Sequence, residues 1–189
     1  EVYSMQSDQN NKLSCTTIFL HWVVAIFIIG LIAVGIYMEE NEVLSLYGWH
    51  KSFGVIALLF ILARVIWRIK EGWPTPASEY KPWERKLSRL THWILLLGMV
   101  LFPISGMLMS GFGGYGIKVF GLELMAMNFD VADPTEIVPV NEALSGVGYL
   151  IHSNLGNLFI ILISLHVLGA LKHHILDKDS TLKRMLGKG

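Results

Sequence analysis

Cysteine and charged residues are scarce in this sequence of 189 residues. Its one cysteine, Cys15, cannot form a disulfide within the chain. The absence of a Cys-x-x-Cys-His segment excludes covalent attachment of a c-type haem. Charged residues make up only 16% of the chain and hydrophobic residues 53%, with a mean hydropathy of +0.51. Soluble domains are rarely this apolar, so the composition predicts an integral membrane protein.

Four apolar runs each have about the 20 residues that a bilayer-spanning helix needs. We predict spans over residues 16–38, 47–69, 90–110 and 146–172. We find no internal repeat and no low-complexity region between them. The expected fold is therefore all-α, a four-helix integral membrane bundle in which residues 1–189 form a single membrane domain. The polar N-terminus lacks the layout of a cleaved signal peptide, so the first run is expected to act as a membrane anchor.

The positive charges lie almost entirely on one side of this predicted bundle. Thirteen of the fifteen lysines and arginines flank the same ends of the spans, and only Lys51 and Lys118 fall on the other side. That other side carries eight carboxylates. Because basic residues favour the cytoplasmic side of a membrane, both termini are expected to be cytoplasmic. We expect membrane lipid as the surroundings and no nucleic-acid partner.

The segment 111–145 is the one long loop, and it is expected on the outer side. It opens with GFGGYG, where four glycines in six residues permit tight turns. An apolar stretch over residues 119–125 follows, and we predict a short helix there that lies on the membrane surface. The linker after the second span contains Pro74, Pro76 and Pro82, which prevent one long helix across it.

The fourth span contains two histidines, His152 and His166, fourteen residues apart. At about 100° per residue they share one helix face, and at 1.5 Å per residue they are separated by about 21 Å. An ionisable side chain inside a membrane span is costly and usually functional. Two of them near opposite leaflets indicate two ligand positions stacked across the membrane.

Two further histidines lie at matching depths in other spans. Depth pairs His50 of the second span with His152, and His21 of the first span with His166. A single such histidine could equally be hydrogen-bonded to a neighbour, but four at matching depths favour two bis-histidine sites. No intramembrane carboxylate or second sulfur accompanies them, which disfavours zinc. Two axial imidazoles suit haem iron, and helix bundles commonly hold such groups.

The other three histidines lie near the cytoplasmic ends of the spans. His92 opens the third span and has no depth-matched partner left. His173 and His174 end the fourth span, and His173 continues the face of His166. An interfacial histidine can anchor a helix end, or it can exchange protons with a quinone because its pKa lies near neutral pH.

Small and basic residues near the histidines could accommodate a haem. Gly54, Gly156 and Gly169 either leave room for it or allow close helix packing. The propionates need partners, for which the sequence offers Arg64, Arg68 and Lys172 on the cytoplasmic side and Lys51 and Asn154 outside. These basic residues could also serve only to set the topology.

Several segments resemble the bacterial cytochrome b-561 family. They are LHW in the first span, GWHKSFG in the second, PISG in the third, IHSNLGNLFIILISLHVLGALKHH in the fourth, and the tail DKDSTLKRML. The resemblance covers nearly the whole chain. It implies a multi-pass cytochrome of the bacterial inner membrane with two haem b groups that exchanges electrons with ubiquinone. It also implies axial ligand roles for His21, His50, His152 and His166.

Some members of that family are superoxide oxidases, which pass electrons from periplasmic superoxide to ubiquinone. A positively charged outer surface would suit that role, and this sequence offers only Lys51 and Lys118 there. Lys51, next to His50, is a candidate for a local entry of the anion, and His173 is a candidate for the quinone site. The partner outside is then superoxide or a soluble periplasmic electron carrier.

Two other functions are compatible with the sequence. The chain could be the cytochrome b membrane anchor of a larger dehydrogenase or hydrogenase. It could also be a metal transporter whose histidines bind zinc or copper.

Overall fold

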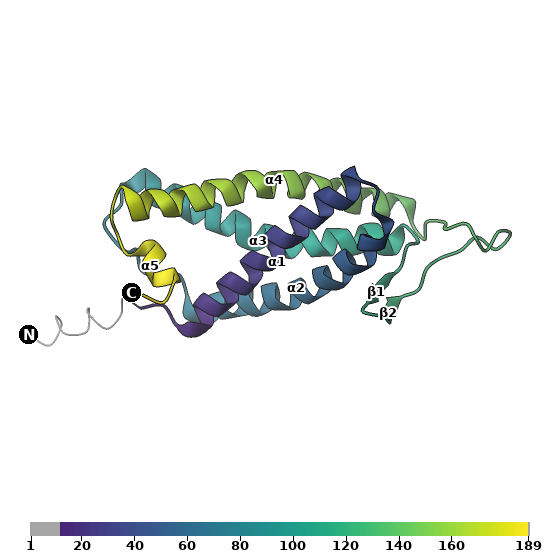
Figure 1. Ribbon diagram of the computed structural model, residues 1–189, viewed down its shortest axis with the longest axis horizontal. Helices are drawn as coiled ribbons and strands as arrows, with labels where there is room; N and C mark the ends of the chain where they lie inside the picture. Colours follow the sequence, from purple (N-terminus) through teal and green to yellow (C-terminus); the bar gives the residue numbers. More distant parts are fainter. Residues whose placement is uncertain (1–11, 189) are drawn as a thin grey trace, which may run out of the picture.

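The computed structural model describes residues 12–188 and has four long helices, the first of which crosses the bundle obliquely (Figure 1). They are α1 (Cys15–Glu40), α2 (Leu44–Glu71), α3 (Pro82–Phe112) and α4 (Glu142–Ile175). A short helix, α5 (Thr181–Met185), follows α4. Residues 1–11, which the sequence analysis expected in the cytoplasm, lie outside the described residues.

All four long helices are long and apolar enough to cross a membrane, which confirms the predicted fold class. Their outward faces carry large apolar side chains, such as Ile26, Leu59 and Ile69, that are more than half exposed. In water so much exposed apolar surface would be an aggregation hazard, whereas lipid covers it. The helices extend beyond the predicted spans, most of all α3, which begins at Pro82 rather than near residue 90.

Local sequence signals start these helices. The Ser14 hydroxyl accepts a hydrogen bond from the Thr17 amide at the start of α1 (3.3 Å). The Asn141 side chain accepts one from the Leu144 amide at the start of α4 (3.0 Å). Such caps satisfy amides that have no partner within the helix. α3 starts at a proline, whose missing amide proton costs nothing in the first turn.

A small apolar core lies in the middle of the bundle, where all four helices meet. Its centre is Phe159 of α4, which is fully buried and stacks on Phe102 of α3 with ring centres 5.5 Å apart. A Cβ atom at Gly98 would lie 2.7 Å from the Phe159 ring, so only glycine fits there. The buried members of the core are Val24, Ile28, Ala57, Ile61, Phe102 and Phe159.

The predicted surface helix over residues 119–125 is wrong, because the segment forms a β-hairpin. Strand β1 (Ile117–Val119) pairs antiparallel with β2 (Leu122–Met125). The two-residue turn between them, Phe120 and Gly121, has positive φ at both positions, which matches the twist of a hairpin and not a helix. The Ser52 hydroxyl of α2 accepts a hydrogen bond from the Phe120 amide (3.1 Å) and so fixes the turn.

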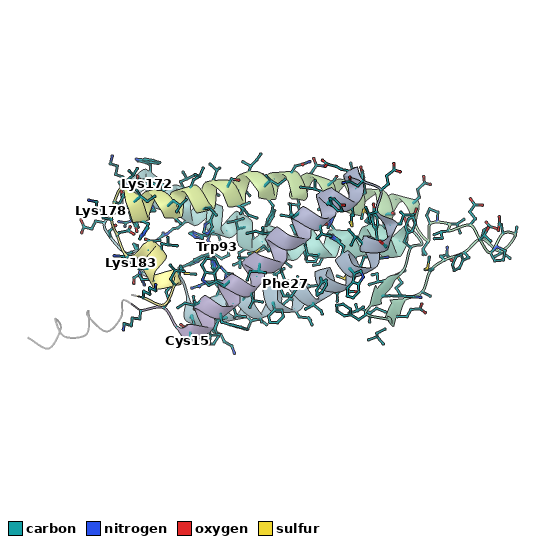
Figure 2. All side chains as sticks on the ribbon, viewed as in Figure 1. Cys15, Phe27, Trp93, Lys172, Lys178 and Lys183 are labelled. Atoms are coloured by element: carbon teal, nitrogen blue, oxygen red, sulfur yellow. The ribbon has the colours of Figure 1, made fainter. Side chains whose placement is uncertain are left out.

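The hairpin and α5 mark the two ends of the bundle (Figure 1). We call the end with β1 and β2 the hairpin end. Lys172, Lys178 and Lys183 gather at the opposite end, where α1 begins at Cys15 (Figure 2), and we call it the basic end. There the Trp22 indole of α1 donates a hydrogen bond to the Met185 carbonyl (2.8 Å) and ties α5 to the bundle.

Candidate functional site

Two pairs of histidines meet inside the bundle, one pair toward each end. The hairpin-end pair consists of His50 on α2 and His152 on α4, with ring centres 6.3 Å apart and ring planes at 85°. The basic-end pair consists of His21 on α1 and His166 on α4, with ring centres 6.2 Å apart and planes at 52°. Helix α4 therefore supplies one member of each pair.

The spacing of each pair fits two imidazoles bound to one metal ion. A metal–imidazole bond is about 2 Å long, and the ring centre lies about 1 Å beyond the nitrogen, which places two ring centres about 6 Å apart. Both pairs have this separation. The structure thus brings together the residues that depth matching paired, while their role as ligands stays a prediction.

At the hairpin-end pair, the backbone of α3 orients one ring. The Phe102 carbonyl oxygen accepts a hydrogen bond from His152 Nδ1 (2.9 Å), and the Ser105 hydroxyl lies 3.3 Å from the same nitrogen. Such a contact fixes the tautomer that leaves Nε2 free for a metal. His50 Nδ1 is buried without a hydrogen-bond partner among the described residues.

Two glycines leave room for these rings, and the sequence predicted this role for neither of them. A Cβ atom at Gly106 of α3 would lie 2.9 Å from His152 Cε1, and one at Gly35 of α1 would lie 3.3 Å from His50 Cε1. Of the three glycines predicted to make room, Gly54 and Gly169 face open space, and a Cβ at Gly156 would lie 3.7 Å from Phe102. Open space beside His50 is compatible with a bulky group, but Gly106 and Gly35 contact the rings directly.

The basic-end pair is surrounded by different chemistry. Arg64 of α2 donates a hydrogen bond from Nη2 to His21 Nδ1 (3.0 Å). A third histidine, His92 of α3, lies against His166 with ring centres 5.3 Å apart and also packs on Trp73 at 5.8 Å. His92 was expected to have no partner at its depth, and the structure corrects this. The shared depth of His92 and His166 was the signal that could have found it.

Neither pair has the additional ligands of a typical zinc site. In residues 12–188, the one group of three or more metal-ligating side chains is His173, Asp177 and Asp179, which lie outside the two pairs. Structural zinc usually takes four protein ligands and catalytic zinc three. Two imidazoles alone leave most of a metal's coordination to another group, such as the four nitrogens of a haem.

Comparison with protein families supports the same chemistry. Residues 12–188 match the model of the family described as prokaryotic cytochrome b561. The chain belongs to the prokaryotic cytochrome b561 family. It is therefore a haem-binding electron-transport protein of a bacterial membrane, and haem b is the cofactor of the family.

The chain is similar to several named bacterial proteins. The chain is 38% identical to cytochrome b561 homolog 2 of Escherichia coli (strain K12) over 176 residues, which covers 89% of this chain and 87% of the relative. It is 29% identical to a protein named probable superoxide oxidase CybB from Yersinia pestis, covering 95% and 98% of the two chains. It is 24% identical to cytochrome b561 homolog 1 of Escherichia coli (strain K12), covering 93% and 97%.

An apolar groove of about 520 Å³ adjoins the hairpin-end pair of this cytochrome. It lies between α1 and α2. Gly30 of α1 lines it, and a Cβ atom added to that glycine would meet no other atom within 4 Å. His50 and Trp49 form one end of its wall. An apolar cleft next to a histidine predicted to ligate iron suits the porphyrin edge of a haem.

Lys51, the candidate for anion entry, is held by neutral oxygens. Its ammonium group donates to the Ser110 hydroxyl (3.2 Å) and to the Tyr115 and Gly116 carbonyls (3.3 and 3.2 Å). These contacts tie the start of the loop to α2. No carboxylate lies within 4 Å of it among the described residues, whereas Lys118 is paired with Glu123 (3.2 Å).

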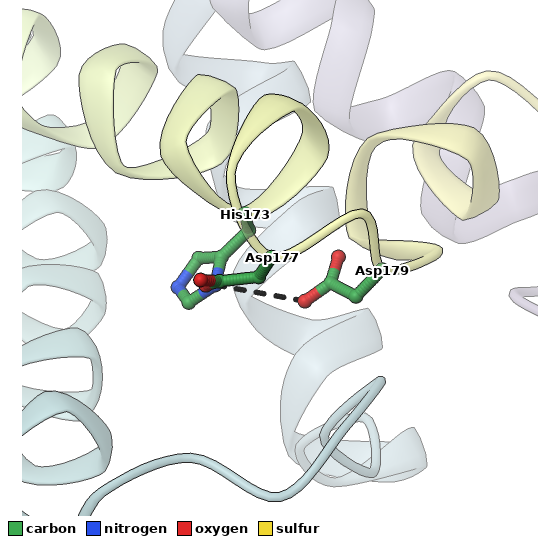
Figure 3. Close-up of side chains that lie close together, drawn as sticks. All are labelled: His173, Asp177 and Asp179. Carbon is green, nitrogen blue, oxygen red and sulfur yellow. Dashed lines mark hydrogen bonds and ion pairs between the residues drawn. The ribbon is translucent and has the colours of Figure 1, made fainter.

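His173, the candidate for quinone chemistry, lies in a polar cluster at the basic end (Figure 3). Its Nδ1 contacts Asp177 at 2.7 Å and Asp179 at 3.5 Å. The Tyr80 hydroxyl donates to Asp179 (2.7 Å), and the Tyr80 ring packs on His173 with centres 4.5 Å apart. The cluster therefore joins the end of α4 to the linker before α3. The neighbouring His174 has a buried Nδ1 without a partner among residues 12–188.

The residues proposed to bind the propionates differ in whether other groups of the protein already bind their side chains. Lys172 is already paired with Glu84 (2.9 Å) and Asp177 (2.7 Å). Asn154 donates to the Leu150 carbonyl of its own helix (2.6 Å). Arg64 lies beside the basic-end pair, and Arg68 packs over Trp73 at 5.5 Å. Arg64 is therefore the cation best placed for an acidic group at that pair.

Proposed function

We propose that residues 1–189 form one membrane domain that binds two haem b groups and moves electrons across the bacterial inner membrane. The electrons pass between the ubiquinone pool and a periplasmic redox partner, for which superoxide is the leading candidate. The observation that carries the proposal is the presence of two histidine pairs of the same spacing, near opposite ends of one bundle and joined by α4. Haem supplies reversible one-electron chemistry where it is bound.

The protein's part is to hold and orient the cofactors. His50 and His152 would hold the iron at the hairpin end, and His21 and His166 the iron at the basic end. The buried core around Phe159 separates the two pairs and excludes water between them. The distribution of lysine and arginine supports an orientation with the basic end in the cytoplasm and the hairpin end in the periplasm.

Superoxide as the donor gives a balanced reaction. Two superoxide anions each lose one electron and leave as dioxygen, and one ubiquinone takes up the two electrons and two protons to become ubiquinol. Lys51, which follows His50 in α2, provides a positive charge without a carboxylate partner among the described residues, and this charge would attract the anion. The relative named probable superoxide oxidase supports this choice of substrate. His173 is the residue proposed to exchange protons at the quinone.

The decisive experiment combines a haem assay with two reduction tests on the purified protein. We expect two haem b groups per chain, reduction by ubiquinol, and reduction by superoxide generated in the same cuvette. Fewer than two haems per chain would reject the two-site arrangement. Reduction by ubiquinol without reduction by superoxide would leave a soluble periplasmic carrier as the partner outside.

The same purified protein also tests the two alternative functions, a membrane anchor and a metal transporter. Co-purification of a stable soluble dehydrogenase or hydrogenase subunit would identify the chain as a membrane anchor. A colourless protein that contains zinc or copper would identify a metal transporter, against which membership of a cytochrome family already argues.

A further inference from the structure

The short helix α5 buries one charged side chain, Arg184, at the basic end. Arg184 is only 5% exposed, whereas its neighbour Lys183 on the same helix is exposed. The Nη1 group of Arg184 donates a hydrogen bond to the carbonyl of Thr75, in the linker between α2 and α3 (2.9 Å). The Tyr80 hydroxyl of the same linker lies 2.9 Å from Thr181 Oγ1, at the start of α5. Arg184 is therefore fixed between α5 and the linker.

This buried guanidinium has no negatively charged partner among residues 12–188. The ion pairs found there do not include it, and its buried Nε has no hydrogen-bond partner. The two carboxylates that precede α5 in the chain, Asp177 and Asp179, already bind other side chains. Arginine is almost never fully buried without a partner, because an unpaired charge in the interior is strongly destabilising. The surroundings of Arg184 therefore suit an anion that residues 12–188 do not supply.

On one side, α5 reaches the basic-end pair through α1. Met185, the residue after Arg184, accepts a hydrogen bond at its carbonyl oxygen from the Trp22 indole (2.8 Å). The Trp22 ring meets the ring of the adjacent His21 edge-on, with centres 5.4 Å apart. Figure 1 shows α5 between the end of α4 and the start of α1. The residue next to Arg184 thus touches the layer of side chains that surrounds the pair.

On the other side, the linker reaches the same pair through α3. Thr75, whose carbonyl Arg184 binds, follows Trp73 by two residues. Trp73 packs on His92 with ring centres 5.8 Å apart, and His92 packs on His166 with ring centres 5.3 Å apart. Helix α5 and the linker therefore enclose the basic end around the pair and add a buried cation to it.

We infer that Arg184 binds a propionate of the haem at the basic-end pair and so anchors that cofactor to α5. This inference rests on the proposed two-haem function. A propionate is a carboxylate, and a guanidinium can donate two N–H groups to one carboxylate. Haem carries two propionates, so Arg64 beside the pair and Arg184 on α5 can each bind one.

A phospholipid phosphate would also satisfy a guanidinium, but the burial of Arg184 disfavours that source. Lipid headgroups lie at the outer surface of a membrane protein, where they attract exposed basic side chains. Lys183 is such a side chain on the same helix, whereas Arg184 is enclosed by protein. A propionate approaches from inside the bundle, the side toward which Arg184 is buried.

Haem release from the purified holoprotein tests the inference. The background is His152→Ala, which under the proposed function keeps the haem of the basic end alone, and excess apomyoglobin captures the haem that is released. Arg184→Gln should speed release about tenfold, because a hydrogen bond between charged groups contributes roughly that much to binding. Lys183→Gln is the matched control, since it removes the same charge from the exposed face of α5, and it should leave the rate unchanged.

Resonance Raman spectroscopy of the same holoproteins detects the contact itself. The propionate bending band of a haem shifts when a hydrogen bond to the propionate is lost, whereas a merely structural role of Arg184 would leave the band in place. Arg184→Gln should move the band, and Lys183→Gln should not. If Arg184→Gln does not fold, Arg184→Lys gives the same test, because it keeps the charge but loses the planar fork of donors.

An unmoved propionate band in the Arg184 variants would overturn the inference, even though the two-haem function stands. Loss of bound phospholipid from Arg184→Gln with the band unmoved would assign the arginine to a lipid phosphate and overturn it as well. Faster release from Arg184→Gln in a His166→Ala background, which keeps the hairpin-end haem, would place the contact at the other site and also contradict it. A wild-type preparation with fewer than two haems would instead reject the proposed function itself.

Discussion

The two ends of the bundle present the same pair of residues in different surroundings. At the hairpin end, the Phe102 carbonyl oxygen contacts His152, and Lys51 ties the start of the loop before α4 to α2. At the basic end, His21 and His166 lie beside Arg64, with His92 as a third imidazole. Helix α4 thus supplies one histidine to each pair, while α1, α2 and α3 make the surroundings of the two pairs chemically distinct.

The largest effect is expected from removing the histidines of α4 one at a time. His152→Ala should lose the haem of the hairpin end, and His166→Ala that of the basic end, so each variant should retain about half of the wild-type haem. A haem assay per mole of protein measures this. Asn154→Ala is the matched control, because its side chain bonds only to the Leu150 carbonyl of its own helix. Either histidine variant with two haems would refute the assignment.

The next largest effect is expected from filling the space that Gly106 leaves beside the His152 ring at the hairpin end. In Gly106→Ala the new Cβ atom would press on the His152 ring, and overpacking of this kind costs about 1–3 kcal/mol. We expect loss of haem from the hairpin-end pair alone, or a lower unfolding temperature. Gly156→Ala serves as the control, since its Cβ would meet Phe102 at an ordinary contact distance of 3.7 Å. Equal behaviour of the two variants would contradict the packing argument.

A smaller effect is expected from substitution of Lys51. Comparison with the same substitution at Lys118 distinguishes the roles of the two outer lysines. Lys51→Met removes a charge without a carboxylate partner among the described residues and should slow reduction by superoxide by several-fold at low salt. Lys118→Met makes the same change in charge but affects a lysine already paired with Glu123. Initial rates over a range of ionic strength measure both. If Lys118→Met slows the reaction as much as Lys51→Met, the local entry at Lys51 is wrong.

The smallest effect is a change of stability with pH at the basic end. The hydrogen bond from Lys172 holds the pKa of Asp177 below its ordinary value of 3.8, with a further contribution from His173. Because the pKa is lower in the folded state, the stabilisation is present above about pH 4 and is lost as the pH falls through the folded value. Thermal unfolding between neutral pH and about pH 3 should show this loss, and Asp177→Asn should reduce it.

The helices were predictable because a bilayer demands about 20 apolar residues in a row, and four runs meet that demand. The ends of the helices were harder to predict from the sequence. Hydropathy placed the start of the third span near residue 90, but the polar segment from Pro82 continues the same helix. The pairing of histidines by depth also followed from sequence, because the rise of a helix is fixed.

What the sequence could not show are the contacts that depend on how helices cross. His92 and Gly106 lie on α3, and each meets α4 at a point that only the packing of the two helices determines. The hairpin was missed because Phe120 adopts a left-handed backbone that bulky residues rarely take, stabilised by the hydroxyl of Ser52. The contact of Arg64 with His21 likewise joins residues 43 positions apart.

The position of α4 as the last of the four spans has a consequence for biosynthesis. A nascent chain that has inserted α1 to α3 already holds His21 and His50, but neither has its partner before α4 emerges from the ribosome. Both sites then become complete with the insertion of a single helix. Under the proposed two-haem function, cofactor capture would wait for α4, and a chain truncated before α4 would have neither pair.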